Sequence, residues 1–555
     1  MRRRHLAAAI ALAAAAAMAL TACSGSTDNG TSASGGKGGT LTILTQATQI
    51  NLDPAKSQNL AITTMGLIER RLTTWDIQKG KPAEVVPDLA TTIGTASDGG
   101  KTWTYTLKDG LKFADGTPIT AQDIKYGIER SFAPELSGGL GYHKSLLVGG
   151  ADYKGPYTGG ELASIQTPDA KTIVFHLNAP YGDWPWIASM PAFAPVPKAK
   201  DNPQTYGENP VATGPYKVAS NKQGTELDLV RNTHWDAKTD PVRTAGPDKI
   251  VFKESQDVST STQTLISDAG SAKTSFLATY LGAAELNLVN KNPDAKKRLA
   301  TSDAGPLTYL ALNTQRPALK DLKVRQAIEY AVDTKAFIIA QGGPQAAIRA
   351  TTLITPGIPG REEYDLYPSG ADGDVAKAKQ LLAEAGHSSD LKLVLWAQND
   401  PSNQAQAQAL QQGIERAGIQ VTIKPLDVNT LFNDATTGAN PDYDLVLSSW
   451  QPDFPSANGN IQPLFASSQI GGGGYNLSRY SNPDVDKLIA QASATVDPAA
   501  AQKLWAQTDK RIMQDAAVVP LTYAKQSFLA GSDVKNFFIA SFPAYPNYLT
   551  VTLGQ

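Results

Sequence analysis

The stretch LKLVLWAQNDPSNQAQAQALQQGIERAGIQVTI, residues 391–423, decides the fold class of this chain. It begins with the apolar segment LKLVLW (391–396), continues through a polar loop into a Gln/Ala-rich helical segment, and ends after Gly418 on the strand IQVTI (419–423). A strand, a helix and a second strand in this order predict a parallel βαβ crossover. The chain is therefore expected to have an α/β fold.

A further short strand, DYDLVLSSW (442–450), leads into the turn-prone loop SSWQPDFPSA (448–457). Ligands of open α/β sheets bind beyond the carboxyl ends of the strands, which is where this loop is expected to lie. The loop places one carboxylate, Asp453, between Trp450 and Phe454. Because an unpaired buried carboxylate costs several kcal/mol, Asp453 is expected to meet a cation, either a Lys or Arg of the chain or a ligand.

The first half of the chain has a different pattern. Residues 101–108, KTWTYTLK, alternate apolar and polar as in a half-buried strand, and KTIVFHL (171–177) predicts another strand. Thr120 with Asp123 predicts a capping box at the start of a helix. The segment from about 76 to 190 is expected to be α+β, and the Pro-rich stretch 184–197 marks its end. From about 308 the runs 320–339 and 375–385 have helical spacing, which indicates a second α/β unit.

The N-terminus is typical of a secretory signal peptide. A basic start, residues 1–5, precedes an apolar run of fifteen residues, 6–20. As a helix this run would span about 22 Å, short of the roughly 30 Å hydrocarbon core of a bilayer, so a permanent transmembrane anchor is disfavoured. The run ends in Leu-Thr-Ala-Cys (20–23), which is similar to a bacterial lipobox, and Cys23 is the only cysteine of the chain. We expect a signal peptide over 1–22 and lipidation of Cys23.

Residues 24–39 are mostly Gly, Ser and Thr and predict a flexible tether with a mean reach of about 20 to 25 Å. Loss of residues 1–22, which include three arginines, changes the formal net charge from −2 to −5. A mildly acidic surface gives no reason to expect a nucleic acid as partner. The remaining chain has no run of eighteen apolar residues. It is expected to be an extracytoplasmic body that only its lipid holds to the cell membrane.

Seven segments, taken in order, resemble the extracellular solute-binding proteins of peptide-type ABC importers, a class that includes oligopeptide, dipeptide and nickel binders. They are INLDP (50–54), YTLKDGLKFADGTPITAQDIKYGIERSF (105–132), ATGPYKV (212–218), YLALNTQRPALKDLKVRQAIEYAVD (309–333), AKAKQLLAEAG (376–386), YDLVLSSWQPDF (443–454) and YSNPDVDKLI (480–489). The resemblance implies a two-lobed, hinge-closing periplasmic-binding-protein fold. It further implies a monomer that captures short peptides and delivers them to the membrane subunits of an ABC permease. No cofactor and no metal site are expected from the residues.

The resemblance and the change of pattern near residue 308 together give the expected domain boundaries. After the signal peptide (1–22) and the lipid-anchored tether (23–39), lobe I comprises 40–75 and 190–307, and the extra α+β subdomain of lobe I comprises 76–189. Lobe II is expected to span 308–519, and the last residues, 520–555, return to lobe I.

The resemblance also implies a binding site. In oligopeptide binders the corresponding loop resembles Gly-Trp-x-x-Asp-Tyr, and its acid holds the α-ammonium group of the peptide. The string here is Ser449 to Phe454, so Asp453 is expected to receive the amine and Trp450 to form a pocket wall, while Phe454 departs from the usual Tyr. The peptide main chain is expected to pair with exposed strand edges. The expected ligand-binding residues are Asp453, Trp450, Ser449, Gln451, Phe454, Thr48, Gln49 and Trp396.

Other functions stay open from the sequence. The same scaffold could bind an oligosaccharide, stacked on aromatic residues such as Trp396 and Trp450, or a metal chelate. It could also act as a receptor that captures a secreted peptide signal without importing it.

An enzyme such as a serine hydrolase or peptidase is disfavoured. The sequence contains no G-x-S-x-G, and one of its S-x-x-K matches, Ser34 to Lys37, falls in the tether. The histidines of the body have no metal-binding spacing. They are His143, His176, His234 and His387.

Overall fold

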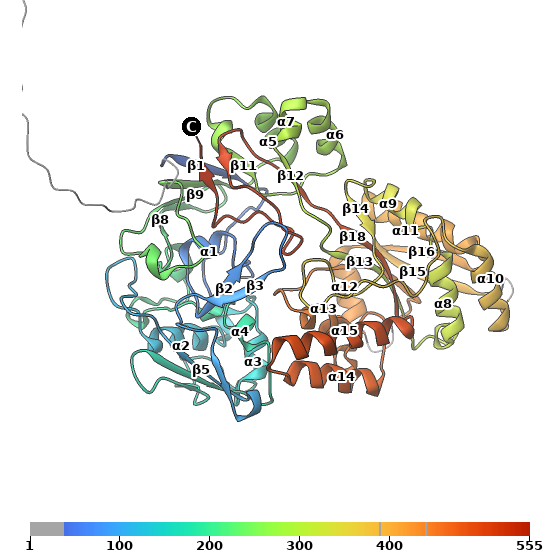
Figure 1. Cartoon of the computed structure of the whole chain (residues 1–555), viewed down its shortest axis with the longest axis horizontal. Helices are drawn as coiled ribbons and strands as arrows, with labels where there is room; N and C mark the ends of the chain where they lie inside the picture. Colours follow the sequence, from blue (N-terminus) through green and yellow to red (C-terminus); the bar gives the residue numbers. More distant parts are fainter. Residues whose placement is uncertain (1–37, 388–389, 439–440, 555) are drawn as a thin grey trace, which may run out of the picture. The chain divides into compact units, whose positions relative to one another are not determined.

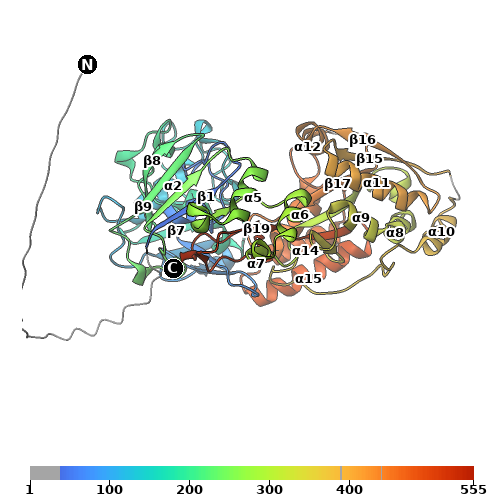
Figure 2. The same cartoon turned by 90° about the horizontal axis from the view of Figure 1, so that it is seen from above.

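The structure is a computed structural model that describes residues 38–387, 390–438 and 441–554. The expected signal peptide, Cys23 and nearly all of the expected tether lie outside the described residues. Residues from Gly36 onward form one compact unit, and the description below concerns that unit. Its helices and strands are labelled in Figure 1 and seen from a second direction in Figure 2.

The first main sheet has five strands in the order β11-β1-β10-β9-β8. β1 runs parallel to β10 and β11, whereas β10, β9 and β8 are antiparallel neighbours. Their bounds are β1 (Thr40–Leu44), β8 (Tyr216–Lys222), β9 (Glu226–Arg231), β10 (Lys249–Lys253) and β11 (Ser275–Leu277). Leu41 and Ile43 of β1 are fully buried and Thr42 and Leu44 are only partly buried, because successive side chains of a strand point to opposite faces. The helices of this part of the chain are α1 (Thr64–Ile68), α5 (Val258–Ser267), α6 (Ala283–Lys291) and α7 (Pro293–Lys297).

The insertion between β1 and β8 contains a second, antiparallel sheet in the order β4-β5-β7-β6. Its strands are β4 (Thr95–Ser97), β5 (Thr102–Thr106), β6 (Ile165–Gln166) and β7 (Thr172–His176), so the strands predicted at 101–108 and 171–177 are confirmed. The capping box is also confirmed, because the Asp123 amide donates to Thr120 Oγ1 and the Thr120 amide donates to the Asp123 carboxylate at 2.8 Å. The other elements here are β2 (Thr73–Asp76), β3 (Glu84–Pro87), α2 (Ala121–Arg130), α3 (Tyr142–Leu146) and α4 (Trp184–Ile187).

The second main sheet has six strands in the order β14-β18-β13-β17-β15-β16. These are β13 (Leu307–Leu312), β14 (Ala347–Arg349), β15 (Lys392–Gln398), β16 (Gln420–Leu426), β17 (Leu445–Trp450) and β18 (Val518–Ala524). The predicted βαβ crossover is confirmed: β15 and β16 are parallel over their full lengths and α11 (Pro401–Glu415) connects them. Strand β18 keeps residues 520–524 in this sheet, beyond the position 519 at which the sequence places the end of lobe II. The domain boundaries expected from the sequence remain a proposal.

The run 320–339, expected to be helical, forms two helices, α8 (Leu322–Ala331) and α9 (Thr334–Gln341). The break falls at Val332–Asp333 because Asp333 caps α9, accepting the Ala336 amide at 2.8 Å. The remaining helices of this lobe are α10 (Val375–Glu384), α12 (Val428–Thr437), α13 (Ala457–Phe465), α14 (Pro483–Ala494) and α15 (Pro498–Gln514). Short strands β12 (Leu299–Thr301), β19 (Ser527–Leu529), β20 (Val534–Lys535) and β21 (Thr552–Leu553) form two small pairs in the segments that join the lobes and end the chain.

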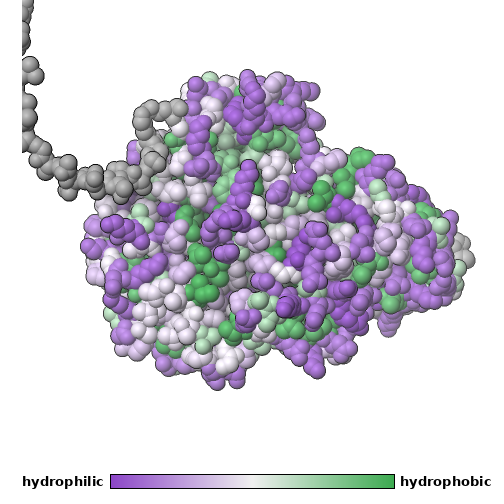
Figure 3. Space-filling model, viewed as in Figure 1, coloured by the Kyte–Doolittle hydropathy of each residue, from purple (hydrophilic) through white to green (hydrophobic). Residues whose placement is uncertain are grey.

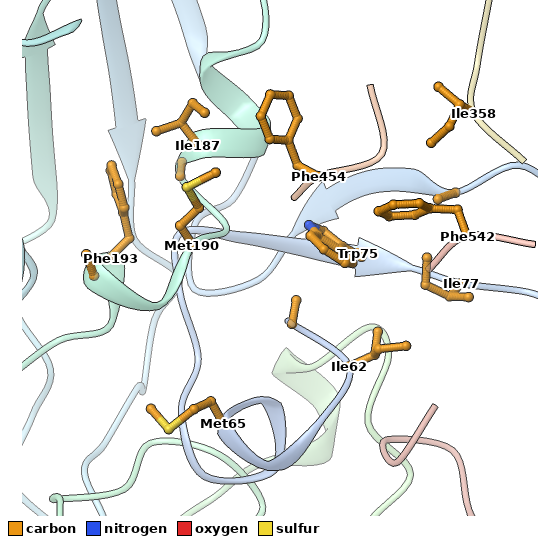
Figure 4. Packing of buried hydrophobic residues seen from close by; sticks show 14 of the residues in the cluster. Ile62, Met65, Trp75, Ile77, Ile187, Met190, Phe193, Ile358, Phe454 and Phe542 are labelled. Carbon is orange, nitrogen blue, oxygen red and sulfur yellow. The ribbon is translucent and has the colours of Figure 1, made fainter. Parts of the chain in front are cut away.

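The buried apolar residues show how the lobes are joined. One cluster lies within the second lobe and includes Leu310, Leu395 and Leu447. A larger cluster extends through lobe I and the extra subdomain and takes in residues of lobe II, among them Phe454. Figure 4 shows Phe454 beside Ile187 of α4, with Trp75 and Phe542 close by. In this conformation the two lobes therefore share part of their core.

On the face seen in Figure 3 the hydrophobic residues form separate small patches among hydrophilic ones. Among the described residues, no helix combines the length and the apolar character that crossing a membrane requires.

Candidate ligand-binding site

The candidate site begins where β17 ends. After Trp450 the chain turns through residues 451–455 and enters α13, whose N-cap is Ser456. Pro452 and Pro455 hold this loop away from regular structure. The arrangement confirms the predicted order of strand, loop and helix, and it presents Asp453 at the carboxyl end of the strand.

Asp453 meets a phenol of the other lobe. The hydroxyl of Tyr142, in α3 of the extra subdomain, donates to Asp453 Oδ2 at 2.6 Å, and the two residues are 311 positions apart. Burial raises the pKa of Asp453, and the hydrogen bond from Tyr142 lowers it by less, so the pKa is above its usual range. In the described part of the chain no ion pair and no charged neighbour acts on this carboxylate. The cation expected from the sequence is therefore not supplied by a described Lys or Arg.

Two pairs of aromatic rings belong to this region. The rings of Tyr142 and Phe454 meet edge to face at 5.5 Å, and those of Trp450 and Tyr475 lie 5.3 Å apart. Trp450 is held in place because its indole Nε1 donates to the carbonyl of Gly459 at 2.7 Å. Tyr475 is 43% exposed, so its ring is accessible from the solvent. A carboxylate that no described Lys or Arg neutralises, with aromatic residues nearby, is an environment that favours a cationic group.

The backbone of β17 has one paired and one largely open edge. Ser449 pairs with Thr308 of β13, and Trp450 pairs with Leu307. On the opposite edge the pairing with β15 is limited to Leu445 and Val446. Among the described residues, no strand pairs with the end of β17 on that side. Gln451 lies just beyond it and donates from Nε2 to the carbonyl of Pro543 at 3.1 Å.

Thr48 and Gln49 belong to a different part of the site. Both are exposed and follow β1 in lobe I. Gln49 lines a groove of about 430 Å³, together with Asn51, Gln58 and Tyr545. The groove has amide, hydroxyl and aromatic lining residues and no charged one. No hydrogen bond among the described residues joins Thr48 or Gln49 to the loop 449–454, although Tyr545 follows closely on Pro543, the partner of Gln451.

Two of the expected site residues are part of the core in this conformation. Phe454 is 1% exposed and Trp396 is 3% exposed. Trp396 packs on Tyr443, with ring centroids 5.1 Å apart, and the ammonium group of Lys424 lies 4.8 Å from its ring centre. Both side chains are therefore part of the protein core in this conformation and do not face an open space.

Sequence reasoning did not find the residues that the extra subdomain contributes. Tyr142, Tyr181 and Asp183 all contact the loop or the helix that follows Asp453. They lie in short segments with no regular pattern, about 270 to 310 positions from their partners. The KDGLKFADGTPIT hairpin and the helix after it indicate the subdomain, but no local sequence pattern indicates the surface with which it contacts lobe II.

The described residues contain no group of three or more His, Cys, Asp and Glu side chains that could hold a metal ion. The site is thus built from one carboxylate, aromatic rings, amides and backbone edges. Together with two α/β lobes and a subdomain inserted in the first, this defines a two-lobed solute-binding protein.

Comparison with known protein families supports this class of protein. The chain belongs to the bacterial extracellular solute-binding proteins, family 5, whose sequence profile matches residues 84–472. It is similar to the "Probable D,D-dipeptide-binding periplasmic protein DdpA" of Escherichia coli strain K12, at 28% identity over 473 residues, which covers 83% of each chain.

Two solved structures place the fold in the same class. "Clavulanic acid biosynthesis oligopeptide binding protein 2" is 32% identical, with a TM-score of 0.84, and the match covers 93% of this chain and 96% of the other. The murein tripeptide binding protein MppA, in its unliganded open form, matches with a TM-score of 0.76 at 23% identity over 94% of this chain and 99% of the other. The expected two-lobed fold and substrate-binding role are confirmed.

Proposed function

We propose that this protein is an extracytoplasmic receptor for short peptides with a free amino terminus, which it delivers to an ABC importer. The observation that carries the proposal is Asp453, a largely buried carboxylate at the end of β17 with no described cation beside it. A ligand ammonium group would neutralise it, because the described residues engage Asp453 Oδ2 through a neutral hydroxyl only.

The energetics require a second source of affinity. A hydrogen bond to a charged group contributes roughly 1.5 to 3 kcal/mol, whereas micromolar binding needs about 8 kcal/mol. The open edge of β17 beyond Val446 and the exposed residues Thr48 and Gln49 offer backbone groups with which an extended ligand can pair. Side chains of the peptide would then be accommodated in pockets, and selectivity would fall on the peptide ends and on length.

The names of the relatives support a peptide ligand. The three proteins compared above are described as binding D,D-dipeptides, oligopeptides and a murein tripeptide. By extension we propose that this protein works as a monomer with the membrane subunits of a permease, that it is not an enzyme, and that acylated Cys23 anchors it to the cell membrane through the tether.

Isothermal titration calorimetry of residues 24–555 with Ala-Ala-Ala and with its N-acetyl derivative tests the proposal. The wild-type protein is expected to bind the free-amine peptide and to bind the acetylated one much more weakly. Asp453→Asn should weaken binding of the free-amine peptide by about 10- to 100-fold, the effect of losing one charged contact. Asp442→Asn is the matched control, since Asp442 lies on the same lobe with its side chain 70% exposed. Equal affinity of the wild-type and Asp453→Asn proteins would overturn the assignment.

One observation favours an oligosaccharide as a second candidate. The groove beside Gln49 is lined by amides, hydroxyls and the rings of Tyr545 and Tyr548, without a charged side chain. Such groups suit sugar hydroxyls and the apolar faces of sugar rings. Binding of a neutral oligosaccharide that is unchanged in Asp453→Asn would favour this candidate over the peptide.

A further inference from the structure

The extra subdomain contacts lobe II through three consecutive residues, Tyr181 to Asp183. The Gly182 amide donates to the carbonyl of Ser493 in α14 at 2.7 Å. Asp183 Oδ2 accepts the hydroxyl of Ser456 at 2.9 Å, and the Tyr181 hydroxyl accepts Nδ2 of Asn458 at 3.0 Å. Each residue of this segment therefore makes a hydrogen bond to the opposite lobe.

Gly182 fits because it has no side chain. A Cβ at this position would lie 2.0 Å from the carbonyl oxygen of Thr495 and 2.8 Å from its carbonyl carbon. Both are backbone atoms of the segment that joins α14 to α15, so no rotation of a side chain can relieve the clash. The backbone of Gly182 does not have the positive φ that favours glycine. An alanine would thus be compatible with lobe I and incompatible with this approach of lobe II.

Asp183 is placed at the start of a helix of the other lobe. Ser456, which donates to it, is the N-cap of α13, and Asn458 is in the first turn of the same helix. The N-terminus of a helix carries a partial positive charge and favours an anion. This attraction and the Ser456 hydroxyl offset part of the cost of burying the carboxylate.

We propose that Tyr181–Gly182–Asp183 is a latch that holds the two lobes closed, and that Gly182 is the positioning residue that sets how closely they approach. The same approach brings the hydroxyl of Tyr142 to Asp453, so the latch sets the geometry of the candidate site. The latch does not depend on the identity of the ligand, and its test needs none.

The test measures the distance between the lobes in the ligand-free protein. Residues 24–555 contain no cysteine. Lys112→Cys in the extra subdomain and Lys503→Cys in α15, both at exposed positions, can therefore each carry a nitroxide label. Double electron–electron resonance gives the distribution of distances between the two labels. Gly182→Ala is expected to move this distribution to longer distances than in the protein with Gly182.

Gly141→Ala is the matched control in the same subdomain. A Cβ there would meet its nearest atom, Cδ of Lys144, at 3.5 Å, which is ordinary contact. It should leave the distribution unchanged. Ser456→Ala, which changes only lobe II, should broaden the distribution toward longer distances because Asp183 loses its hydroxyl partner. Circular dichroism melting of each variant shows whether it is folded. If Gly182→Ala does not fold, the distance distribution of Ser456→Ala tests the latch proposal on its own.

The proposal fails if Gly182→Ala gives the same distribution as the parent protein, or if the parent is already as open as Gly182→Ala. It also fails if Ser456→Ala leaves the distribution unchanged, or if the control Gly141→Ala shifts it to longer distances as Gly182→Ala does. Failure of peptide binding in calorimetry would contradict the proposed function and leave this distance measurement unaffected.

Discussion

The buried carboxylate of Asp88, inside lobe I, and those of Asp183 and Asp453, between the lobes, differ in their charged partners. Asp88, inside lobe I, is fully buried and ion-paired with Arg70 at 2.7 Å and with Arg243 at 3.1 Å. Burial alone would raise the pKa of Asp88, but Arg243 and Arg70 outweigh it and lower the pKa to about 2. This carboxylate is ionised at any physiological pH.

Among the described residues, no Lys or Arg forms an ion pair with Asp183 or Asp453, which lie between the lobes. Burial raises the pKa of Asp183 to about 6, and the hydrogen bonds from Ser456 and Asn458 only partly offset it. Burial also raises the pKa of Asp453. Asp88 is therefore neutralised by arginines of the chain, whereas Asp183 and Asp453 can be neutralised by a proton or a ligand. That difference is what a receptor that opens and closes around a cationic group requires.

The largest expected effect concerns the permanent cluster. Arg243→Ala removes a fully buried partner of Asp88 and Asp240, and breaking such a pair costs about 3 to 5 kcal/mol of unfolding free energy. Urea denaturation followed by circular dichroism measures it. Arg231→Ala is the control, because its ion pair with Asp248 is exposed and contributes no more than about 1 kcal/mol. Equal losses in both variants would show that lobe I does not depend on its buried ions.

A second prediction concerns pH and lobe closure. The closed state holds the proton of Asp183 up to about pH 6, whereas a solvated Asp loses it near 3.8, so closure binds protons. The free energy that favours the closed state should therefore decrease as pH rises between about 4 and 6. For a pKa shift of this size the decrease is roughly 3 kcal/mol, and above about pH 6 this free energy should no longer change. The distance between labels at positions 112 and 503 should be longer at pH 7 than at pH 4.5.

Asp183→Asn sharpens this prediction, because the amide resembles the protonated acid. The variant should be more closed than wild type at pH 7 and should depend less on pH, with Asp453 accounting for what remains. A distance that is independent of pH in the wild-type protein, or that shortens as pH rises, would contradict the comparison.

The smallest expected effect concerns the neutral partner of Asp453. Tyr142→Phe removes the hydroxyl that stabilises the ionised carboxylate and should weaken binding of Ala-Ala-Ala by about 2- to 10-fold, the size of one ordinary hydrogen bond. Calorimetry measures it. Tyr153→Phe is the control, since Tyr153 donates to Gly160 within the same subdomain. Tighter binding in Tyr142→Phe would instead mean that this hydroxyl competes with the ligand.

Local patterns predicted the elements of the fold but not their meeting points. The alternation of KTWTYTLK, the Thr120–Asp123 capping box and the crossover at 391–423 each depend on neighbours within a few residues, and each is found in the structure. The break between α8 and α9 depends on Asp333, the N-cap of α9, and the helical spacing of residues 320–339 does not reveal it.

The candidate site could be predicted only in part for the same reason. The position of Asp453 after a strand followed from the sequence, but its partner Tyr142 is 311 residues away, and Gly182 is recognisable only once Thr495 is placed against it. Likewise, Trp396 and Phe454 were expected to face a ligand, whereas the folded chain buries both. Contacts between the lobes are set by tertiary packing, which single segments do not encode.

The most direct test of the central claim, that Asp453 receives the amine of a peptide ligand, is native mass spectrometry of residues 24–555 as purified. Comparison of gently desolvated and denatured masses reveals a retained ligand. We expect a mixture of added masses that fragment as short peptides in the wild-type and Asp442→Asn proteins, and their loss in Asp453→Asn. A single added mass of sugar or chelate type, or the same peptides retained in Asp453→Asn, would contradict it.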